Sequence, residues 1–217
     1  VGAATTQGTF LGLIERLDSL ADLGVTMIEL MPIADVPGHR NWGYDGVLHF
    51  APNASYGRPD DLKRLIDEAH ERGLMVMLDV VYNHFGPSGN YLPLYAKSFF
   101  NANHRTPWGD AIGFNQQVVR DFFIHNALYW LEEYRFDGLR LDAVHAIRDD
   151  SSVHVLAELA GRVRAAFQDR HIHLVLENER NEAHWLRRDL SGKPLYYTAQ
   201  WADDIHHCWH VLLTGER

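Results

Sequence analysis

Three carboxylates each stand at or near the end of a short apolar run. Asp79 lies in LMVMLDVV, Asp142 closes FDGLRLD and Glu177 closes HLVLE. Isolated buried carboxylates are costly unless they are paired or used. We therefore expect these three side chains to converge on one site that performs acid–base or nucleophilic chemistry.

Arg140 stands two residues before Asp142 in the same run. Alternate residues of a strand share a face, so the two side chains are expected side by side. A neighbouring arginine keeps a carboxylate ionised, as a nucleophile requires, although a single such pair also fits a structural role. The arginine would repel a cation, and no HExxH or paired-cysteine spacing occurs, so no metal site is expected.

Paired carboxylates favour glycoside hydrolysis, in which one attacks the anomeric carbon and the other protonates the leaving oxygen. Asp142, beside Arg140, suits the nucleophile. Glu177 has no basic neighbour on its own strand, which favours the protonated form that a general acid needs. Trp42 and Tyr44 lie in a flanking segment where they can stack on sugar rings, but ordinary packing explains each of them equally well.

Helical patterns alternate with the apolar runs, which predicts repeated βα units and a parallel sheet. Strands are expected at 25–30, 74–81, 136–142, 172–177 and 196–200. No glycine-rich phosphate-binding turn follows any of them, which disfavours a nucleotide-binding open sheet. Polar residues at the carboxyl ends of strands favour an α/β fold with a partial (β/α)8 barrel of five to six units.

Two helices have candidate capping residues at their starts. Asn115 is expected to cap the long helix before the third strand, and Ser151 or Ser152 the helix after it. The segments 31–59 and 82–115 are long for βα connections, and we expect them to line the site.

Residues 1–217 are expected to form a single domain. A complete barrel has eight strands and about 250 residues, so we expect an incomplete barrel that lacks the first and last strands. Its open sheet edges are expected to promote self-association of the isolated chain.

The composition limits which binding partners and which cellular compartment are expected for the protein. The formal net charge of −9 argues against nucleic acid or an anionic membrane as the partner. The chain has no run of about 20 apolar residues. The single cysteine, Cys208, excludes an internal disulfide, and we expect it to be buried in the last helix. A soluble cytoplasmic protein is therefore expected.

Three separated motifs resemble the first three signature regions of the α-amylase family of glycoside hydrolases, in the family's order: DVVYNH, GLRLDAVHAI and HLVLEN. Within the family, NWGYDGV and AQWADDIHHCWHVLLTGE look most like the branch that releases trehalose. The resemblance runs over essentially all 217 residues. It implies a retaining hydrolase that cleaves the α-1,4 bond next to the terminal trehalose of maltooligosyl-trehalose.

The resemblance also implies roles for individual residues. Asp142 would be the nucleophile and Glu177 the acid/base. The implied substrate-binding residues are Arg140, Asn83, His84, Tyr44, His145, Asp79, Trp42 and Asp203. No cofactor is expected, and a Ca²⁺ near Asn83 is implied by family analogy only. The family's fourth region, an Asn-His-Asp, does not occur in the chain.

Two alternatives stay open at the level of sequence. One is another enzyme acting on malto-oligosaccharides or longer α-glucans, such as an α-amylase or a branching enzyme. The other is a catalytically inactive remnant that binds glucan.

Overall fold

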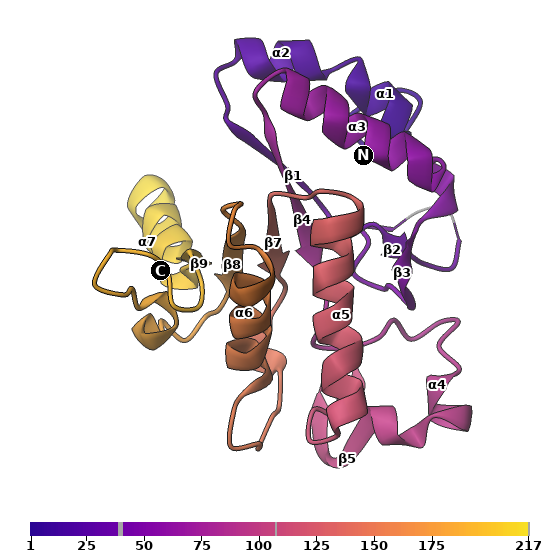
Figure 1. Cartoon of the computed structure of the whole chain (residues 1–217), viewed down its shortest axis with the longest axis vertical. Helices are drawn as coiled ribbons and strands as arrows, with labels where there is room; N and C mark the ends of the chain where they lie inside the picture. The colour runs from indigo at the N-terminus through magenta and orange to yellow at the C-terminus, as the bar shows by residue number, and fades with distance from the viewer. Residues whose placement is uncertain (39–40, 107, 217) are drawn as a thin grey trace.

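The computed structural model describes residues 1–38, 41–106 and 108–216, with a five-stranded parallel sheet at its centre (Figure 1). The sheet has the order β1-β4-β7-β8-β9, and all four neighbouring pairs are parallel. Strands in chain order, joined by helices, make a partial (β/α)8 barrel, as the sequence predicts. The strands are β1 (Met27–Leu30), β4 (Met75–Val80), β7 (Gly138–Leu141), β8 (His173–Glu177) and β9 (Ala199–Trp201).

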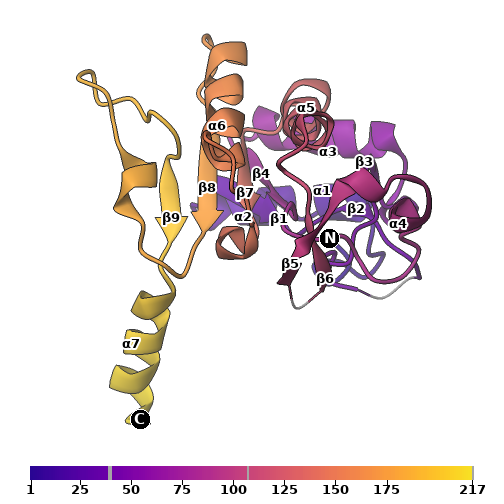
Figure 2. The same ribbon diagram turned by 90° about the horizontal axis from the view of Figure 1, so that it is seen from below.

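Helices α3, α5 and α6 lie on one side of this sheet (Figure 2). Helix α3 packs against α1 and β4, and α5 packs against α6. The helices are α1 (Phe10–Ile14), α2 (Leu17–Asp22), α3 (Pro59–Glu71), α5 (Gln117–Glu133), α6 (Val155–Ala166) and α7 (Asp203–Thr214), with single 3-10 turns η1 (Ala54–Tyr56), η3 (Val144–Ala146) and η4 (Ala183–Leu186).

The two faces of the sheet carry different side chains. Leu78, Leu139 and Leu174 are paired across β4, β7 and β8, and all three are buried in the main hydrophobic core. Successive strand residues point to opposite faces, so the neighbouring positions Asp79 and Arg140 lie on the other side. The helices therefore pack against the face of the sheet that carries the leucines, and the opposite face carries the charged groups.

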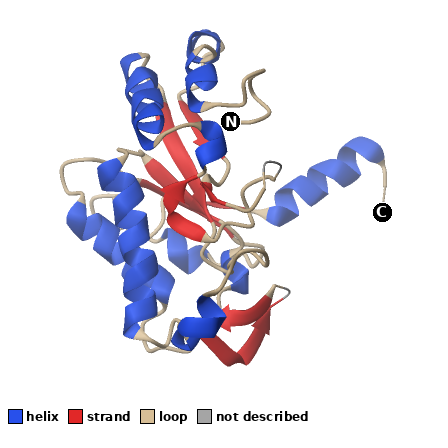
Figure 3. Cartoon of the chain, turned by 90° about the vertical axis from the view of Figure 1, so that its right-hand side faces the viewer, coloured by secondary structure: helices blue, strands red, loops and turns tan. Residues whose placement is uncertain are grey.

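Two long connections fold into small hairpins that the sequence did not predict. After β1, strands β2 (Ala34–Asp35) and β3 (Leu48–Pro52) pair antiparallel. After β4 come α4 (Leu92–Tyr95), η2 (Lys97–Phe99) and the antiparallel pair β5 (Phe100–Thr106) and β6 (Gly109–Ile112). Figure 3 shows a two-stranded hairpin standing apart from the central sheet.

Both predicted helix caps are wrong. Helix α5 starts after Gln116, whose side chain makes no capping hydrogen bond, so Asn115 is not the cap. The ring of His154 caps α6 by accepting a hydrogen bond from the Leu156 amide. Ser151 instead donates its main-chain amide to the Asp149 carboxylate, in the turn that precedes the helix.

Helix α7 projects away from the rest of the described chain (Figure 2). It exposes Ile205, Trp209 and Leu212, and the prediction that Cys208 is buried is wrong because this thiol is exposed. No helix within the described residues is both long enough and apolar enough to span a bilayer.

Candidate active site

Arg140 joins all three of the carboxylates singled out from the sequence. Its Nη1 donates to both carboxylate oxygens of Asp79, at 2.8 and 2.7 Å, and to Asp142 Oδ1 at 3.1 Å. Its Nη2 lies 2.9 Å from Glu177 Oε2. Asp79 is on β4, Arg140 on β7 and Glu177 on β8, three adjacent strands. The predicted convergence of the three carboxylates is therefore present.

The three carboxylate side chains differ in how far they are exposed to solvent. The Asp79 side chain is 2% exposed, whereas those of Asp142 and Glu177 are 13% and 28% exposed. A molecule entering from solvent can therefore reach Asp142 and Glu177, while Asp79 lies behind Arg140 and holds it in place.

Burial and charge shift the pKa values at the base of the site. Burial raises the pKa of Asp79 to about 7, a shift that the contacts with Arg140 and Tyr44 partly offset. Burial alone would lower the pKa of Arg140, but the surrounding carboxylates, Asp79 foremost, raise it. Arg140 is therefore cationic near neutral pH.

The segments after β1 and β4 add polar groups around this cluster. Tyr44 donates from its hydroxyl to Asp79 Oδ2 at 2.8 Å, and burial together with that carboxylate raises the pKa of Tyr44. Asn83 donates from Nδ2 to Asp142, and its Oδ1 contacts Nδ1 of His84. Burial lowers the pKa of His84, so its ring is neutral near pH 7.

Glu177 has a basic neighbour after all. It has none on its own strand, as the sequence indicates, but Arg140 reaches it from the adjacent strand β7. Glu177 Oε2 also accepts the main-chain amide of Ala143 at 2.7 Å. Ala143 has a left-handed backbone with φ 42°, and this turn directly after Asp142 aims the amide at Glu177.

A pocket opens over Asp142 and Glu177. The residues that line it are Trp42, Tyr44, Asp45, His84, Trp108, Arg140, Asp142, Ala143 and Glu177. Gly86 makes it possible for the segments after β1 and β4 to meet, because a Cβ there would lie 2.0 Å from the Asp45 carbonyl oxygen. Trp108 stacks on His84, with ring centroids 4.3 Å apart and planes 9° apart.

The remaining predicted residues lie outside this pocket. His145 is on η3, with Nε2 3.9 Å from Glu179, and Asp203 starts α7, where its only ion pair among the described residues is with His206 at 3.8 Å. Within the described part of the chain, Asp203 is not among the residues that line the pocket, and it forms no ion pair with Arg140.

Sequence reasoning missed two tryptophans. The Arg140 guanidinium lies 4.5 Å from the ring centroid of Trp201, the last residue of β9. The strand-end position that identified Glu177 also applies to Trp201, since the two residues are paired in register. Trp108 has no strand-end signal, because it lies inside the long connection between β4 and α5, a segment that was expected to line the site only as a whole.

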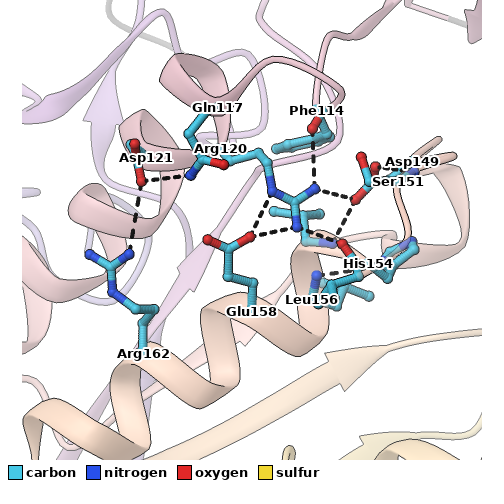
Figure 4. A network of polar contacts seen from close by, with 12 residues as sticks. Phe114, Gln117, Arg120, Asp121, Asp149, Ser151, His154, Leu156, Glu158 and Arg162 are labelled. Atoms are coloured by element: carbon cyan, nitrogen blue, oxygen red, sulfur yellow. Dashed lines mark hydrogen bonds and ion pairs between the residues drawn. The ribbon is translucent and has the colours of Figure 1, made fainter.

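A buried ion network fixes the segment that follows β7 (Figure 4). Arg120 on α5 donates to Asp149 at 2.7 Å, to Glu158 at 2.7 Å and to the main-chain carbonyls of Phe114 and Val153. The Asp149 carboxylate is fully buried. Arg120 therefore ties the loop between Asp142 and α6 to the start of α5, which anchors the far end of the segment that begins at Asp142.

The residues around Asn83 do not fit a Ca²⁺ ion. Such an ion takes six to eight oxygen ligands, but the Asn83 amide is engaged with Asp142 and His84. No group of three or more metal-ligating side chains occurs among the described residues.

Comparison with known proteins agrees with this geometry. The family model "Alpha amylase, catalytic domain" matches residues 2–126. The chain is 46% identical to the malto-oligosyltrehalose trehalohydrolase of Mycobacterium tuberculosis and 44% identical to that of Saccharolobus solfataricus, in each case over 100% of this chain and 38% of the relative. The resemblance that the motifs indicated is confirmed, and the chain spans about 38% of the length of these relatives.

A solved structure from Salmonella typhimurium, named as an α-amylase, has 52% sequence identity and a TM-score of 0.97. The match covers 99% of this chain and 37% of that one. The carboxylates at the strand ends, the parallel strand order and the matched family model lead to one conclusion: the chain belongs to the α-amylase catalytic-domain family.

Proposed function

We propose that this chain carries the catalytic carboxylates of a retaining glycoside hydrolase that cleaves the α-1,4 bond next to the terminal trehalose of maltooligosyl-trehalose. One observation carries the proposal: a single guanidinium, that of Arg140, contacts both Asp142 and Glu177. Two carboxyl groups on one guanidinium are held close, and retaining glycosidases use a separation of about 5–5.5 Å.

In the first step, Asp142 attacks the anomeric carbon while Glu177 gives its proton to the leaving oxygen. The glycosidic bond breaks, trehalose leaves with the proton, and the sugar stays bound to Asp142 as a glycosyl ester. In the second step, the Glu177 carboxylate takes a proton from water, whose oxygen displaces Asp142. The malto-oligosaccharide leaves with its original anomeric configuration.

The neighbouring residues have positioning roles in this proposal. Asn83 and Arg140 orient the Asp142 carboxylate through the hydrogen bonds described above. Tyr44, Trp42 and neutral His84 line the pocket where the reacting sugar would lie, and aromatic rings present flat apolar faces to such a ligand. Asp79 holds Arg140, and His145 and Asp203 are assigned to substrate binding on the resemblance alone.

Two isosteric variants test the assignment in the complete protein. Asp142→Asn removes the nucleophile and Glu177→Gln removes the acid, so each is expected to lower kcat on maltooligosyl-trehalose by at least about 10³-fold. Asp169→Asn is the matched control, because Asp169 is an exposed aspartate in the connection between α6 and β8 and does not line the pocket. Activity that survives Asp142→Asn would refute the nucleophile assignment, and an inverted product anomer in the NMR spectrum would refute the retaining mechanism.

An α-amylase or branching activity is the second candidate. The Salmonella typhimurium structure named as an α-amylase supports it. Product analysis separates the candidates: trehalose release supports the first, whereas glucose oligomers or new branches without trehalose support the second. A protein that binds glucan without turnover would be the non-catalytic alternative. We also propose that the protein is cytoplasmic, because a single cysteine is typical of a reducing compartment.

A further inference from the structure

The side chain of Arg140 reaches across the neighbouring strand to an aromatic ring on β9. The strand order places β8 between β7, which carries Arg140, and β9, which ends at Trp201. The guanidinium carbon lies over the indole, 4.5 Å from the ring centroid. A cation is attracted to an aromatic face within about 6 Å of its centroid. Trp201 therefore adds an aromatic contact to those that Arg140 makes with Asp79, Asp142 and Glu177.

Trp201 covers one face of the guanidinium. The Arg140 side chain is 4% exposed, whereas Trp201 is 48% exposed, so the ring remains open to solvent while it shields the cation. Trp201 is paired in register with Glu177, which places it on the sheet face that carries the charged groups. Within the described residues, Trp201 does not line the pocket over Asp142. Its contact with that site therefore runs through Arg140.

The guanidinium is oriented by its two terminal nitrogens. Nη1 and Nη2 contact the three carboxylates, whereas Nε of Arg140 is buried and has no hydrogen-bond partner among the described residues. Every polar contact that orients this side chain is thus made with a carboxylate. The strength of these contacts depends on whether each carboxylate is ionised.

Two of the three carboxylates change charge in the proposed reaction. Glu177 carries a proton at the start of the first step, and Asp142 becomes an uncharged ester in the intermediate. Each change weakens one ion pair of Arg140 and would allow the guanidinium to shift toward Asp79. The attraction to the Trp201 ring depends on the charge of the guanidinium, which stays protonated throughout.

We infer that Trp201 is a positioning residue, which holds the Arg140 guanidinium in place while Asp142 and Glu177 change charge. The inference rests on the proposed function, because that function assigns the charge changes. An indole suits this role, since it attracts a cation more strongly than the other aromatic side chains. Because Trp201 acts through Arg140, it affects the chemical steps rather than the binding of substrate.

A substitution series at Trp201 in the complete protein tests the inference. Trp201→Leu keeps an apolar side chain but removes the aromatic face, so it is expected to lower kcat on maltooligosyl-trehalose about tenfold. KM is expected to change less than about twofold, because uniform binding is not altered. Trp201→Phe retains a ring and is expected to keep kcat within about threefold of the unaltered protein.

Trp209→Leu is the matched control, since it makes the same change at a tryptophan of α7 that is 59% exposed. It is expected to leave kcat and KM unchanged, and circular dichroism establishes that each variant is folded. An unchanged kcat in folded Trp201→Leu would overturn the inference. A rise in KM without a fall in kcat, or equal losses in Trp201→Leu and Trp201→Phe, would also overturn it.

An NMR measurement keeps this test separate from the proposed function. The Nε–H signal of Arg140 is identified by its absence in Arg140→Lys, and its exchange with water is followed. Trp201→Leu uncovers the guanidinium and is expected to speed this exchange at least about tenfold, whereas Trp209→Leu should not. Unchanged exchange in Trp201→Leu would overturn the inference. An unaltered protein that releases no trehalose would refute the proposed function, and faster exchange in Trp201→Leu would still identify Trp201 as the group that holds Arg140.

Discussion

Asn83 donates two hydrogen bonds to Asp142, one to its main-chain carbonyl and one to carboxylate oxygen Oδ2, both at 2.8 Å. Asn83 follows β4 and Asp142 follows β7, so a side chain from one strand end fixes both the backbone and the carboxylate of the next. The remaining carboxylate oxygen, Oδ1, contacts Arg140.

Loss of the Asn83 amide is expected to misplace the Asp142 carboxylate, which is the nucleophile in the proposed mechanism. Asn83→Ala should lower kcat about 10²-fold, because a displacement of about 1 Å costs that much in an oriented reaction. Steady-state kinetics measure the effect, and circular dichroism establishes that the variant is folded. Asn103→Ala, an exposed asparagine on β5, is the control. An unchanged kcat in a folded Asn83→Ala protein would contradict the positioning role.

The left-handed turn at Ala143 is expected to limit which residues can follow Asp142. Alanine in this region costs about 1–2 kcal/mol, so Ala143→Gly should preserve stability or raise it by about 1 kcal/mol. Ala143→Val should lower both stability and kcat, because a β-branched residue disfavours this backbone and displaces the amide that binds Glu177. Urea unfolding measures the stabilities. Ala96→Val, at a residue with φ −134°, is the control and should be tolerated.

Removal of Arg120 is expected to be among the most destabilising single changes. Arg120→Met leaves Asp149 buried without its cation, which typically costs about 3–5 kcal/mol. Arg162→Met, also drawn in Figure 4, breaks a half-exposed pair with Asp121 at 3.9 Å and should cost less than about 1 kcal/mol. Similar unfolding midpoints for the two variants would show that the Arg120 network does not anchor the loop.

His49 is expected to make the protein sensitive to acid. Complete burial among aromatic rings lowers its pKa from 6.5 to about 4. The folded state therefore favours the neutral ring, so this contribution is fully present above pH 6.5 and is lost as the pH falls toward 4, by about 3 kcal/mol in total.

His49→Phe should remove that acid sensitivity, since phenylalanine fits an aromatic surrounding and has no proton to gain. Urea unfolding at pH 7.5, 5.5 and 4.5 gives the comparison. His125→Gln, an exposed histidine on α5, is the control and should keep the pH dependence of the unaltered chain. A His49→Phe protein that loses stability in acid as steeply as the unaltered chain would show that another group is responsible.

The isolated 217-residue chain is expected to associate with itself. Strands β1 and β9 are the edges of the central sheet, and α7 exposes Ile205 and Leu212 at 58% and 76%. Sedimentation velocity should show association that increases with concentration and weakens in the double variant Ile205→Glu, Leu212→Glu. Val118→Glu, at an exposed position on α5, should have no such effect. A monomer at every concentration would contradict the expectation.

The parts of the fold that depend on buried periodic patterns were predictable from sequence. The apolar runs around Asp79, Arg140 and Glu177 are strands, and the strand-end rule placed these charged groups together. Contacts between segments were not predictable in this way. The ion pair between Arg140 and Glu177 joins the adjacent strands β7 and β8. The stacking of Trp108 on His84 joins a hairpin to a strand end. The helix caps were not predictable either, since His154 is an uncommon capping residue and its role depends on the turn before it.

Three carboxylates share the single guanidinium of Arg140, which leaves a formal charge of −2 when all four groups are ionised and −1 when Glu177 carries its proton. The transition state of glycoside transfer resembles an oxocarbenium ion, with positive charge on the sugar ring. When Asp79 is ionised, above its pKa of about 7, this negative surplus lowers the energy of the positive charge as it develops. The same field repels anions, so phosphate groups on a ligand are expected to weaken its binding at this site.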